Sequence, residues 1–336
     1  CAIIAVIWVG GKQVYGGIIT QGEVVALVNY MSQILVELVK LANLIILINK
    51  AIACGNRIEE VLETKSSIVN APSEVNAASD SENAVVFSHV SMAYASTSEE
   101  ALTDIDFTAK KGQTIGIIGG TGSGKSSVVN LIPRFYDVSK GSVLVNGRDV
   151  RDYDLTELRD KIGVVMQKAV LFQGTIAENL RWGKPDATDE ELWHAIEVAQ
   201  ATDVVEGKEG KLDYMIEQGG RNLSGGQKQR LTIARAVVKD PDILILDDSA
   251  SALDFATDAR LRAALRNLQG NKTIFIVSQR TSSIQFADQI IVMDDGQVAG
   301  IGTHEQLLEQ CEIYREIYES QFKKEDLQKT NEGGVR

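Results

Sequence analysis

The chain has 336 residues, of which 44% are hydrophobic and 24% charged, and its formal net charge is −12 at pH 7. This length suits about two domains, and the acidic balance argues against nucleic acid as the main partner, because duplex binding needs clustered Lys and Arg. Cys1, Cys54 and Cys311 lie far apart without a Cys-x-x-Cys pair, so we expect neither a disulfide framework nor a zinc site. A reducing, cytosol-facing environment fits best.

The N-terminal part is strongly apolar, and its only charges within residues 1–49 are Lys12, Glu23, Glu37 and Lys40. The segment Val24–Asn49 lacks Pro and Gly and would form a helix about 39 Å long, enough to cross a ~30 Å hydrocarbon core. We interpret it as a membrane-spanning helix, with a buried helix of a soluble bundle as the alternative. Glu37 and Lys40 have the spacing to pair on one helix face, which would reduce the cost of burying charge.

The segments that flank this helix are polar. Gly10–Glu23 is Gly-rich and is predicted to be a turn between two spanning helices. Lys50, Arg57 and Lys65 follow the helix whereas only Lys12 precedes it, which favours a cytoplasmic C-terminal side. The first residue is Cys and no basic segment precedes the apolar residues, so we expect no signal peptide and interpret the start as lying within a hydrophobic helix.

The rest of the chain is predicted to be an α/β domain. Residues 57–64 continue as a polar helix, and residues 65–84, rich in Ser, Asn and Ala, are typical of a linker. Beyond them, strand-like and helical segments alternate, which predicts a mostly parallel sheet with crossover helices. Strands are expected at 85–94, 114–119, 142–147, 162–166, 242–248, 273–279 and 289–302, and helices at Lys125–Phe135, Asp189–Ala199, Gly226–Lys239 and Thr257–Leu268.

Gly119–Ser126, GGTGSGKS, matches the phosphate-binding pattern G-x-x-x-x-G-K-S between an apolar strand and a helical segment. The glycines let backbone N–H groups converge on phosphate oxygens, and the helix N-terminus adds a positive dipole end. Lys125 is expected to bind the β- and γ-phosphates of ATP, and the Ser126 hydroxyl to bind Mg²⁺. The predicted nucleotide-binding residues of this segment are Gly119, Gly120, Thr121, Gly122, Ser123, Gly124, Lys125, Ser126 and Ser127.

A second apolar strand, within ILILDDSASALD, ends on Asp247 and Asp248. In a phosphate-loop fold, an Asp at the end of a neighbouring buried strand holds Mg²⁺, and we predict that role for Asp247. An Asp between a strand and a helix can instead cap the helix, and we expect this role of Asp254 rather than of Asp247.

The block from Asn222 to Asp254, NLSGGQKQR followed by LTIARAVVKDPDILILDDSASALD, resembles the signature-to-Walker-B region of ATP-binding cassette (ABC) proteins. The resemblance covers residues 85–320. By itself, a Ser and two Gly at a helix start predict a second anion cradle. The resemblance implies that two domains pair head to tail, and that the partner's nucleotide is contacted by Ser224, Gly225, Gly226 and Gln227.

The same resemblance assigns further roles. Tyr94 is expected to stack on adenine, although a tyrosine that packs at a strand end is the alternative reading. Gln167, in VVMQKAVLF, would sense the γ-phosphate and bind Mg²⁺, so that the predicted Mg²⁺ ligands are Ser126, Gln167 and Asp247. Phe172–Asn179 would contact the membrane domain. Asp254 matches the loop that crosses the dimer interface.

The N-terminal part is similar to exporter-type chains of this family, in which membrane and ATPase domains are fused. Residues 1–64 resemble the end of a fifth membrane helix, an outer turn and a sixth helix, with four helices expected upstream. The expected division is 1–64, end of the membrane domain; 65–84, linker; 85–322, an α/β P-loop ATPase with a mostly parallel sheet, an antiparallel part and a helical subdomain; and 323–336, a flexible tail. A multi-pass protein of the cell membrane with its ATPase in the cytoplasm follows.

Two positions depart from the family pattern. Asp248 stands where the family usually has Glu, and Gln279, after TIFIV, stands where it has His. Gln218 also stands where many homodimeric exporters have Glu. With Lys125 and Gln167, Asp248 and Gln279 complete the predicted catalytic set. The pattern resembles the degenerate half of a heterodimeric multidrug-type exporter: its own site binds ATP but hydrolyses it slowly, while its signature completes the partner's site.

The predicted partners are a second ABC half-transporter, in a heterodimer or a homodimer, together with membrane lipid and a transported substrate of unspecified chemistry. A non-transporting regulatory nucleotide-binding module is the alternative function. A soluble ABC ATPase that acts on nucleic acid or ribosomes is disfavoured by the apolar residues 1–49 and the negative charge.

Overall fold

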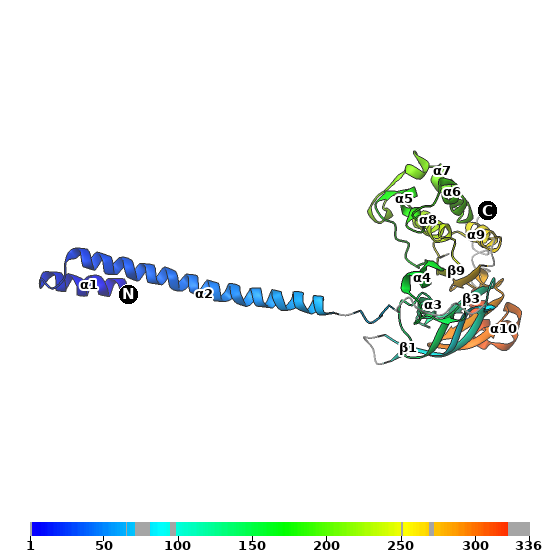
Figure 1. Ribbon diagram of the computed structural model, residues 1–336, viewed down its shortest axis with the longest axis horizontal. Coiled ribbons are helices and arrows are strands. Elements are labelled where there is room, and N and C mark those ends of the chain that lie inside the picture. The colour runs from blue at the N-terminus through cyan, green and yellow to red at the C-terminus, as the bar shows by residue number, and fades with distance from the viewer. Residues whose placement is uncertain are drawn as a thin grey trace, which may run out of the picture. The chain divides into compact units, whose positions relative to one another are not determined.

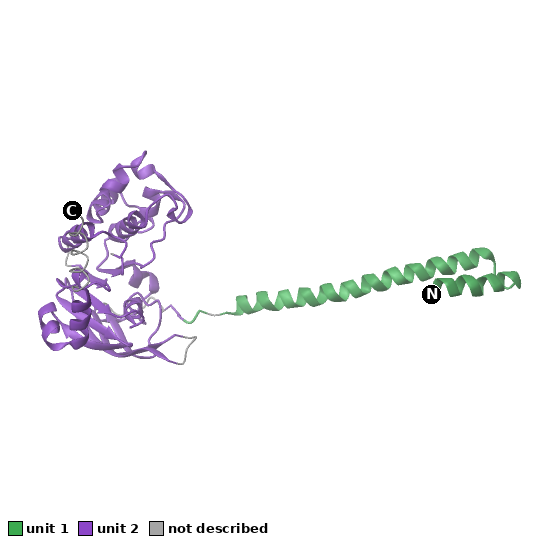
Figure 2. Ribbon diagram, turned by 180° about the vertical axis from the view of Figure 1, so that it is seen from behind, with its two compact units in different colours: residues 1–67 green, residues 68–336 purple. Residues whose placement is uncertain are grey.

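The computed structural model describes residues 2–64, 66–70, 81–94, 99–249, 251–268 and 272–321. The chain divides into two compact units, Cys1–Ser67 and Ile68–Arg336 (Figure 2). The division falls within the predicted linker 65–84, of which residues 65 and 71–80 lie outside the described residues, as does the predicted tail 323–336.

The first unit consists of two helices, α1 (Ala2–Tyr15) and α2 (Gln21–Glu63), with α1 packed beside the beginning of α2 (Figure 1). Thr20 caps α2: its hydroxyl accepts from the Glu23 N–H at 3.4 Å, and its own N–H donates to the Glu23 carboxylate at 2.6 Å. This reciprocal pair satisfies two N–H groups at the helix start. With 43 residues, α2 is about 65 Å long, and the predicted spanning and polar segments form one helix.

The prediction of a turn over Gly10–Glu23 is wrong in its first part. Gly10 lies within α1, and only the segment 16–20 separates the two helices. A Cβ on Gly10 would lie 2.9 Å from both methyl carbons of Val24. The glycine therefore permits close helix packing, and does not mark a turn.

Among the described residues, α2 is the one helix long and apolar enough to cross a membrane, by length and composition. The predicted pairing within it is confirmed, because Lys40 Nζ lies 2.8 Å from Glu37 Oε1.

The second unit contains three sheets. A four-stranded antiparallel sheet has the order β2-β1-β4-β5, a six-stranded sheet the order β12-β11-β3-β10-β9-β6, and β7 pairs with β8. In the six-stranded sheet every pair is parallel except β11 with β12. The strands are β1 (Asn83–Ala93), β2 (Glu100–Lys110), β3 (Thr114–Gly119), β4 (Lys140–Val145), β5 (Arg148–Asp149), β6 (Ile162–Val165), β7 (Gly174–Thr175), β8 (Met215–Ile216), β9 (Ile243–Asp247), β10 (Thr273–Val277), β11 (Gln289–Asp294) and β12 (Gln297–Gly302).

Helices accompany this sheet as predicted for an α/β fold. The α-helices are α3 (Lys125–Leu131), α4 (Leu155–Asp160), α5 (Ile176–Arg181), α6 (Asp189–Val198), α7 (Thr202–Glu206), α8 (Gly225–Val238), α9 (Phe255–Arg266) and α10 (His304–Gln310), with a further helix at 312–321. α3 ends before the predicted Phe135 because Pro133, which lacks a backbone N–H, follows. α5 and α6 both pack on α8 and form a helical subdomain with it (Figure 1).

The central strands are buried on both faces, and alternate residues belong to different cores. In β9, Leu244 and Leu246 face the core that includes the helical subdomain, whereas Ile243 and Ile245 face the core shared with the antiparallel sheet. This explains why ILIL reads as a continuous apolar run. The sheet is thereby held between two layers.

The strand β2 was not among those predicted. Its sequence, EALTDIDFTAK, alternates apolar and polar residues, and its buried residues Leu102, Ile105, Phe107 and Ala109 face the core. β2 pairs with β1 along most of its length, with bulges where the register shifts. The alternation from Ile105 onward was readable in the sequence, but two polar residues between Leu102 and Ile105 break the period of two.

The helix α10 and the helix at 312–321 are joined by a contact between His304, which is partly buried, and Tyr314. Tyr314 is fully buried, and its hydroxyl lies 2.7 Å from His304 Nδ1. Burial is the main cause that raises the pKa of Tyr314 to about 12, and the nearby Tyr318 adds to it. The phenol is therefore held in its neutral form in the folded chain.

This pair predicts an alkaline dependence of stability. Because the folded pKa of Tyr314 lies above the ordinary value of 10.0, its contribution is complete below pH 10 and is lost as the pH rises toward 12. In urea unfolding of the full chain from pH 8 to 12, Tyr314→Phe should lose stability at pH 8, by about 1 kcal/mol for the hydrogen bond. Its deficit relative to the wild type should shrink above pH 10.

Tyr15→Phe is the matched control, because Tyr15 is 97% exposed. Its unfolding free energy should follow the wild type at every pH. A deficit of Tyr314→Phe that stays constant up to pH 12 contradicts the prediction.

Candidate functional site

The carboxyl ends of three neighbouring parallel strands bring the predicted residues together. β3, β10 and β9 are adjacent in the sheet, with β10 in the middle. β3 ends at Gly119, β9 ends at Asp247, and Gln279 follows β10 by two residues. In open α/β sheets this edge is where ligands bind.

Two glycines of the phosphate loop, Gly119 and Gly124, leave no room for a side chain. A Cβ on Gly119 would overlap the carbonyl oxygen of Met293 in β11 and lie 2.6 Å from Ser123 Oγ. Gly124 has φ +93°, and a Cβ there would lie 2.7 Å from Leu102 Cδ2. Gly120 has open space around it, so not every glycine of the loop is fixed by its neighbours.

Lys125, at the first position of α3, turns back onto the loop that precedes it. Its Nζ donates to the carbonyl oxygens of Gly119 and Gly120 at 3.0 and 2.5 Å, and to Ser123 Oγ at 3.3 Å. Burial lowers the pKa of Lys125, while the charges of Asp248 and Asp247 act in the opposite direction. The ammonium group is thus held at the loop by acceptors that an anionic phosphate could replace.

Ser126 and Asp247 form the expected Mg²⁺ pair. Ser126 Oγ donates to Asp247 Oδ1 at 3.0 Å, across two strands of the sheet. Burial is the main cause that raises the pKa of Asp247, and the charge of Asp248 adds to it, whereas the Ser126 hydrogen bond and Lys125 lower it. A hydroxyl and a desolvated carboxylate are oxygen donors that suit Mg²⁺, so the residues fit the ion.

Asp248 is bound by Gln167. Gln167 Nε2, just beyond β6, donates to Asp248 Oδ2 at 3.1 Å. Asp248 itself has φ +45°, and its N–H donates to the carbonyl of Val277 in β10 at 2.9 Å. The backbone at Asp248 is therefore fixed to the neighbouring strand. Because the backbone cannot shift, the length of the Asp248 side chain sets how far its carboxylate reaches toward a ligand.

Gln279 is exposed at the end of β10, on the same edge as Asp247. Its backbone carbonyl accepts from Gln321 Nε2 at 2.7 Å. Gln321 was not among the predicted site residues. The contact between Gln321 and Gln279 joins residues 42 positions apart and has no local sequence pattern, so it could not be predicted from the sequence.

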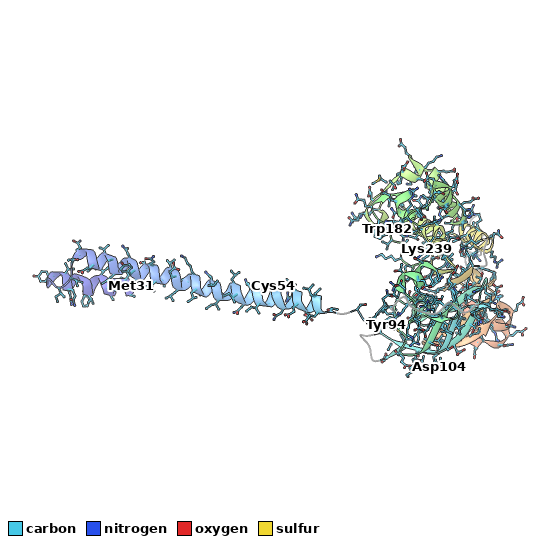
Figure 3. The ribbon with its side chains drawn as sticks, in the orientation of Figure 1. Met31, Cys54, Tyr94, Asp104, Trp182 and Lys239 are labelled. Carbon is cyan, nitrogen blue, oxygen red and sulfur yellow. The ribbon has the colours of Figure 1, made fainter. Side chains whose placement is uncertain are left out.

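Tyr94 lies at the end of β1 beside the phosphate loop, and is labelled in Figure 3. Its hydroxyl lies 2.8 Å from Ser127 Oγ, and its ring meets Tyr136 edge to face at a centroid distance of 5.0 Å. A cavity of about 330 Å³ opens between Tyr94 and the loop; its lining also includes Glu100, Ala101, Gly122, Gly124, Lys125, Ser126, Ser127, Asp295 and Gly296. A base that stacked on Tyr94 would therefore lie next to phosphates in the loop, and the walls from β2 and the β11–β12 turn were missed from the sequence.

The signature residues lie elsewhere in the unit. Ser224 caps α8: its hydroxyl accepts from the Gln227 N–H at 3.3 Å, and its N–H donates to Gln227 Oε1 at 3.1 Å. Gly225 follows in the first turn, where N–H groups have no partner within the helix. α8 belongs to the helical subdomain, away from α3 (Figure 1), and among the described residues no hydrogen bond joins the start of α8 to the phosphate loop.

Phe172, the first residue of the segment Phe172–Asn179, lines a second cavity. Phe172 stacks on Trp182 at a centroid distance of 4.8 Å, and its backbone N–H and carbonyl bind the Asn179 amide. The cavity measures about 340 Å³ and extends to Arg235 and Lys239; Trp182 and Lys239 are labelled in Figure 3. Trp182 is 68% exposed at this rim.

Asp254 has the capping role expected of it. One carboxylate oxygen accepts from the Thr257 N–H at 2.9 Å, and the other from the Thr257 hydroxyl at 2.8 Å. This contact fixes the start of α9 directly after the strand that carries Asp247.

Residues 102–251 match the family model described as "ABC transporter". The chain is 43% identical over 322 residues to an uncharacterized ABC transporter ATP-binding protein of Mycobacterium tuberculosis, covering 95% of this chain and 55% of that protein. It is 38% identical over 326 residues to the beta-(1→2)glucan export ATP-binding/permease protein NdvA of Rhodopseudomonas palustris, covering 96% and 54%.

A solved structure of a bacterial Atm1-family ABC exporter with ATP bound matches with a TM-score of 0.75 and 31% identity, over 90% of this chain and 53% of that one. The expected P-loop ATPase fold is confirmed. The chain spans about half the length of the curated relatives it matches.

The loop geometry makes neighbouring glycines a matched pair for mutation. Gly119→Ala should destabilise the nucleotide-free chain by about 2–4 kcal/mol, since its Cβ meets the backbone of β11. Gly120→Ala, in open space, should change stability by less than about 1 kcal/mol. Chemical denaturation of both variants measures this, and equal losses would refute the assignment of Gly119 as the packed position.

Proposed function

Since the chain carries an ATP-binding domain of the ABC transporter family, we propose that it is an ATP-binding/permease subunit of an exporter. In this function, ATP binding and hydrolysis at a dimer interface drive transport across the cell membrane, with the ATPase domain in the cytoplasm. The observation that carries the proposal is the hydrogen bond from Ser126 to Asp247. This bond joins the end of the phosphate loop to the predicted Mg²⁺ ligand on β9.

ATP fits the cavity between Tyr94 and the loop. Its adenine would stack on the Tyr94 ring, and its phosphates would take the place of the loop carbonyls as partners of Lys125. Mg²⁺, when bound, neutralises charge on the β- and γ-phosphates. Ser126, Asp247 and Gln167 would hold the ion, and the first N–H groups of α3 would bind phosphate oxygens.

The site of this chain hydrolyses ATP slowly in the proposed function. Asp248 is one methylene shorter than Glu, so its carboxylate falls short of the attacking water by up to about 1.5 Å. A misplacement of about 1 Å can lower a rate on the order of a hundredfold. The backbone bond to Val277 keeps Asp248 from moving closer, and the Gln167 amide already binds one of its oxygens.

Gln279 weakens the same site in a second way. A glutamine can donate a hydrogen bond to the γ-phosphate but cannot carry a positive charge or transfer a proton as histidine does. The signature at Ser224–Gln227, by contrast, matches the family pattern and its helix start is well capped. We therefore propose a heterodimer in which this signature completes a competent site on a second ABC half-transporter.

The exporter function is favoured over a regulatory module that does not transport. α2 joins a span of membrane length to the linker before the ATPase unit, and NdvA, a relative along nearly the whole chain, is named as an export protein. We propose Phe172–Asn179, with the adjoining cavity, as the surface that meets the cytoplasmic part of the membrane domain.

The proposal predicts unequal effects of removing the two catalytic carboxylates. The full-length protein is reconstituted with its partner in vesicles, and steady-state ATPase activity and transport are measured. Replacing the partner's catalytic Glu by Gln should lower kcat by on the order of 10²- to 10⁴-fold, the usual contribution of a general base. Asp248→Asn should lower kcat by less than about tenfold, because that site contributes little turnover.

Asp248→Glu combined with Gln279→His is the converse variant. In the background of the inactivated partner, it should raise ATPase activity above that of the unchanged chain. If Asp248→Asn stops turnover as completely as the partner's change, the slow-site proposal fails. ATPase activity without transport of any candidate drug, lipid, peptide or glycan would favour the regulatory module.

A further inference from the structure

The loop after β10 is held by a side chain from the C-terminal end of the described chain. Gln321 lies at the end of the helix at 312–321 and is half-buried. Its Nε2 donates to the Gln279 carbonyl at 2.7 Å. Its Oε1 accepts from both the N–H and the hydroxyl of Thr281, each at 2.9 Å.

These three bonds bracket Arg280. An amide side chain carries a donor and an acceptor side by side, so it can pair with a backbone carbonyl and with the N–H two residues later. Gln321 makes this pairing with Gln279 and Thr281, in the manner of a neighbouring strand. Thr281 is only 1% exposed, and among the described residues its N–H and hydroxyl have no hydrogen-bond partner besides Gln321, so losing Gln321 would cost about 1–3 kcal/mol for each of these two groups.

The other side of the loop is fixed by α9. Arg262 Nη1 donates to the Ser282 carbonyl at 2.6 Å, and Ser283 Oγ donates to Asp258 Oδ2 at 3.3 Å. Asp258 and Ser283 are both almost fully buried. These bonds begin three residues beyond Gln279. Before Gln279, the Ser278 N–H donates to the Ile117 carbonyl at 3.0 Å, and Ser278 Oγ accepts from the Arg280 N–H at 3.0 Å. The Gln279 carbonyl itself is bound by Gln321.

We propose that Gln321 is a positioning residue that sets the backbone of Gln279, and thereby the reach of the Gln279 side chain toward the γ-phosphate of ATP. This inference rests on the proposed function of the site, in which Gln279 contacts that phosphate. Gln321 touches no part of the nucleotide. Its effect is exerted through one carbonyl, one N–H and one hydroxyl of the loop.

The variant that tests this is Gln321→Met, which keeps the side-chain length and removes all three hydrogen bonds. Gln321→Glu keeps the acceptor for Thr281 but loses the donor to Gln279, so it isolates one bond. Ser320→Ala is the matched control, because among the described residues Ser320 Oγ bonds within its own helix alone, to the Ile317 carbonyl at 2.8 Å. Gln279→Ala, alone and combined with Gln321→Met, completes the set.

The readout separates the γ-phosphate from the rest of the nucleotide. The full-length protein, assembled with its partner, is mixed with 8-azido-ATP and increasing AMP-PNP or ADP, and is then irradiated. The label attached to this chain measures how well each nucleotide displaces 8-azido-ATP before irradiation. Gln321→Met should weaken displacement by AMP-PNP about two- to tenfold, the worth of one hydrogen bond, and leave ADP within twofold. Gln279→Ala should do the same, and the double variant should be no weaker than Gln279→Ala alone.

Hydrogen exchange of the segment 278–284 supplies a second readout that does not depend on nucleotide. The Thr281 amide should exchange faster in Gln321→Met and remain protected in Gln321→Glu and Ser320→Ala. Faster exchange together with selective loss of AMP-PNP supports the proposal.

The opposing outcomes are distinct. If Gln279→Ala weakens AMP-PNP selectively and Gln321→Met does not, or if the double variant is additive, Gln321 does not position Gln279 and the inference is overturned while the proposed function stands. If Gln279→Ala leaves AMP-PNP unchanged, the contact with the γ-phosphate is wrong, and both the inference and that part of the proposed function fail. Equal weakening of ADP and AMP-PNP by Gln321→Met shows a general structural defect and also overturns the inference.

Discussion

The structure of the ATPase unit depends on the parallel pairing of β3, β10 and β9 with both faces buried. A buried parallel sheet has only its strand ends at which polar side chains can meet solvent or ligands. Gly119, Asp247 and Gln279 stand at those ends, so their proximity follows from the register of the strands. The capped start of α9 and the bracketed loop after β10 then keep the ends from fraying.

At this edge, three ionisable groups share a partly buried space. Lys125 is attracted to Asp247 and Asp248, while burial disfavours the charge of both Lys125 and Asp247. A cluster with two carboxylates and one ammonium group carries a net negative charge, which suits the binding of a divalent cation. The bond from Gln167 to Asp248 connects this cluster to the segment that follows β6.

The P-loop ATPase fold predicted from the sequence is confirmed, whereas the roles of the site residues stay predictions. GGTGSGKS and the Asp pair are local strings whose geometry is dictated by a strand, a turn and a helix start, and these predictions needed no tertiary information. The strand β2 was missed because its alternation of buried and exposed residues is broken between Leu102 and Ile105, and Gly10 was misread because a glycine serves close helix packing as well as turns. Gln321 could not have been found, since its contact with Gln279 joins segments that have no common pattern in the sequence.

The close contact between Gly119 and β11 has a consequence for the order in which the domain folds during synthesis. β3 lies between β10 and β11, and the carbonyl of Met293 closes the space beside Gly119. β10 and β11 belong to segments that leave the ribosome long after the phosphate loop. When the glycines of the phosphate loop have left the ribosome, the strands that shape the loop have therefore not yet been made. The loop takes its folded conformation only after the last third of the domain has been synthesised.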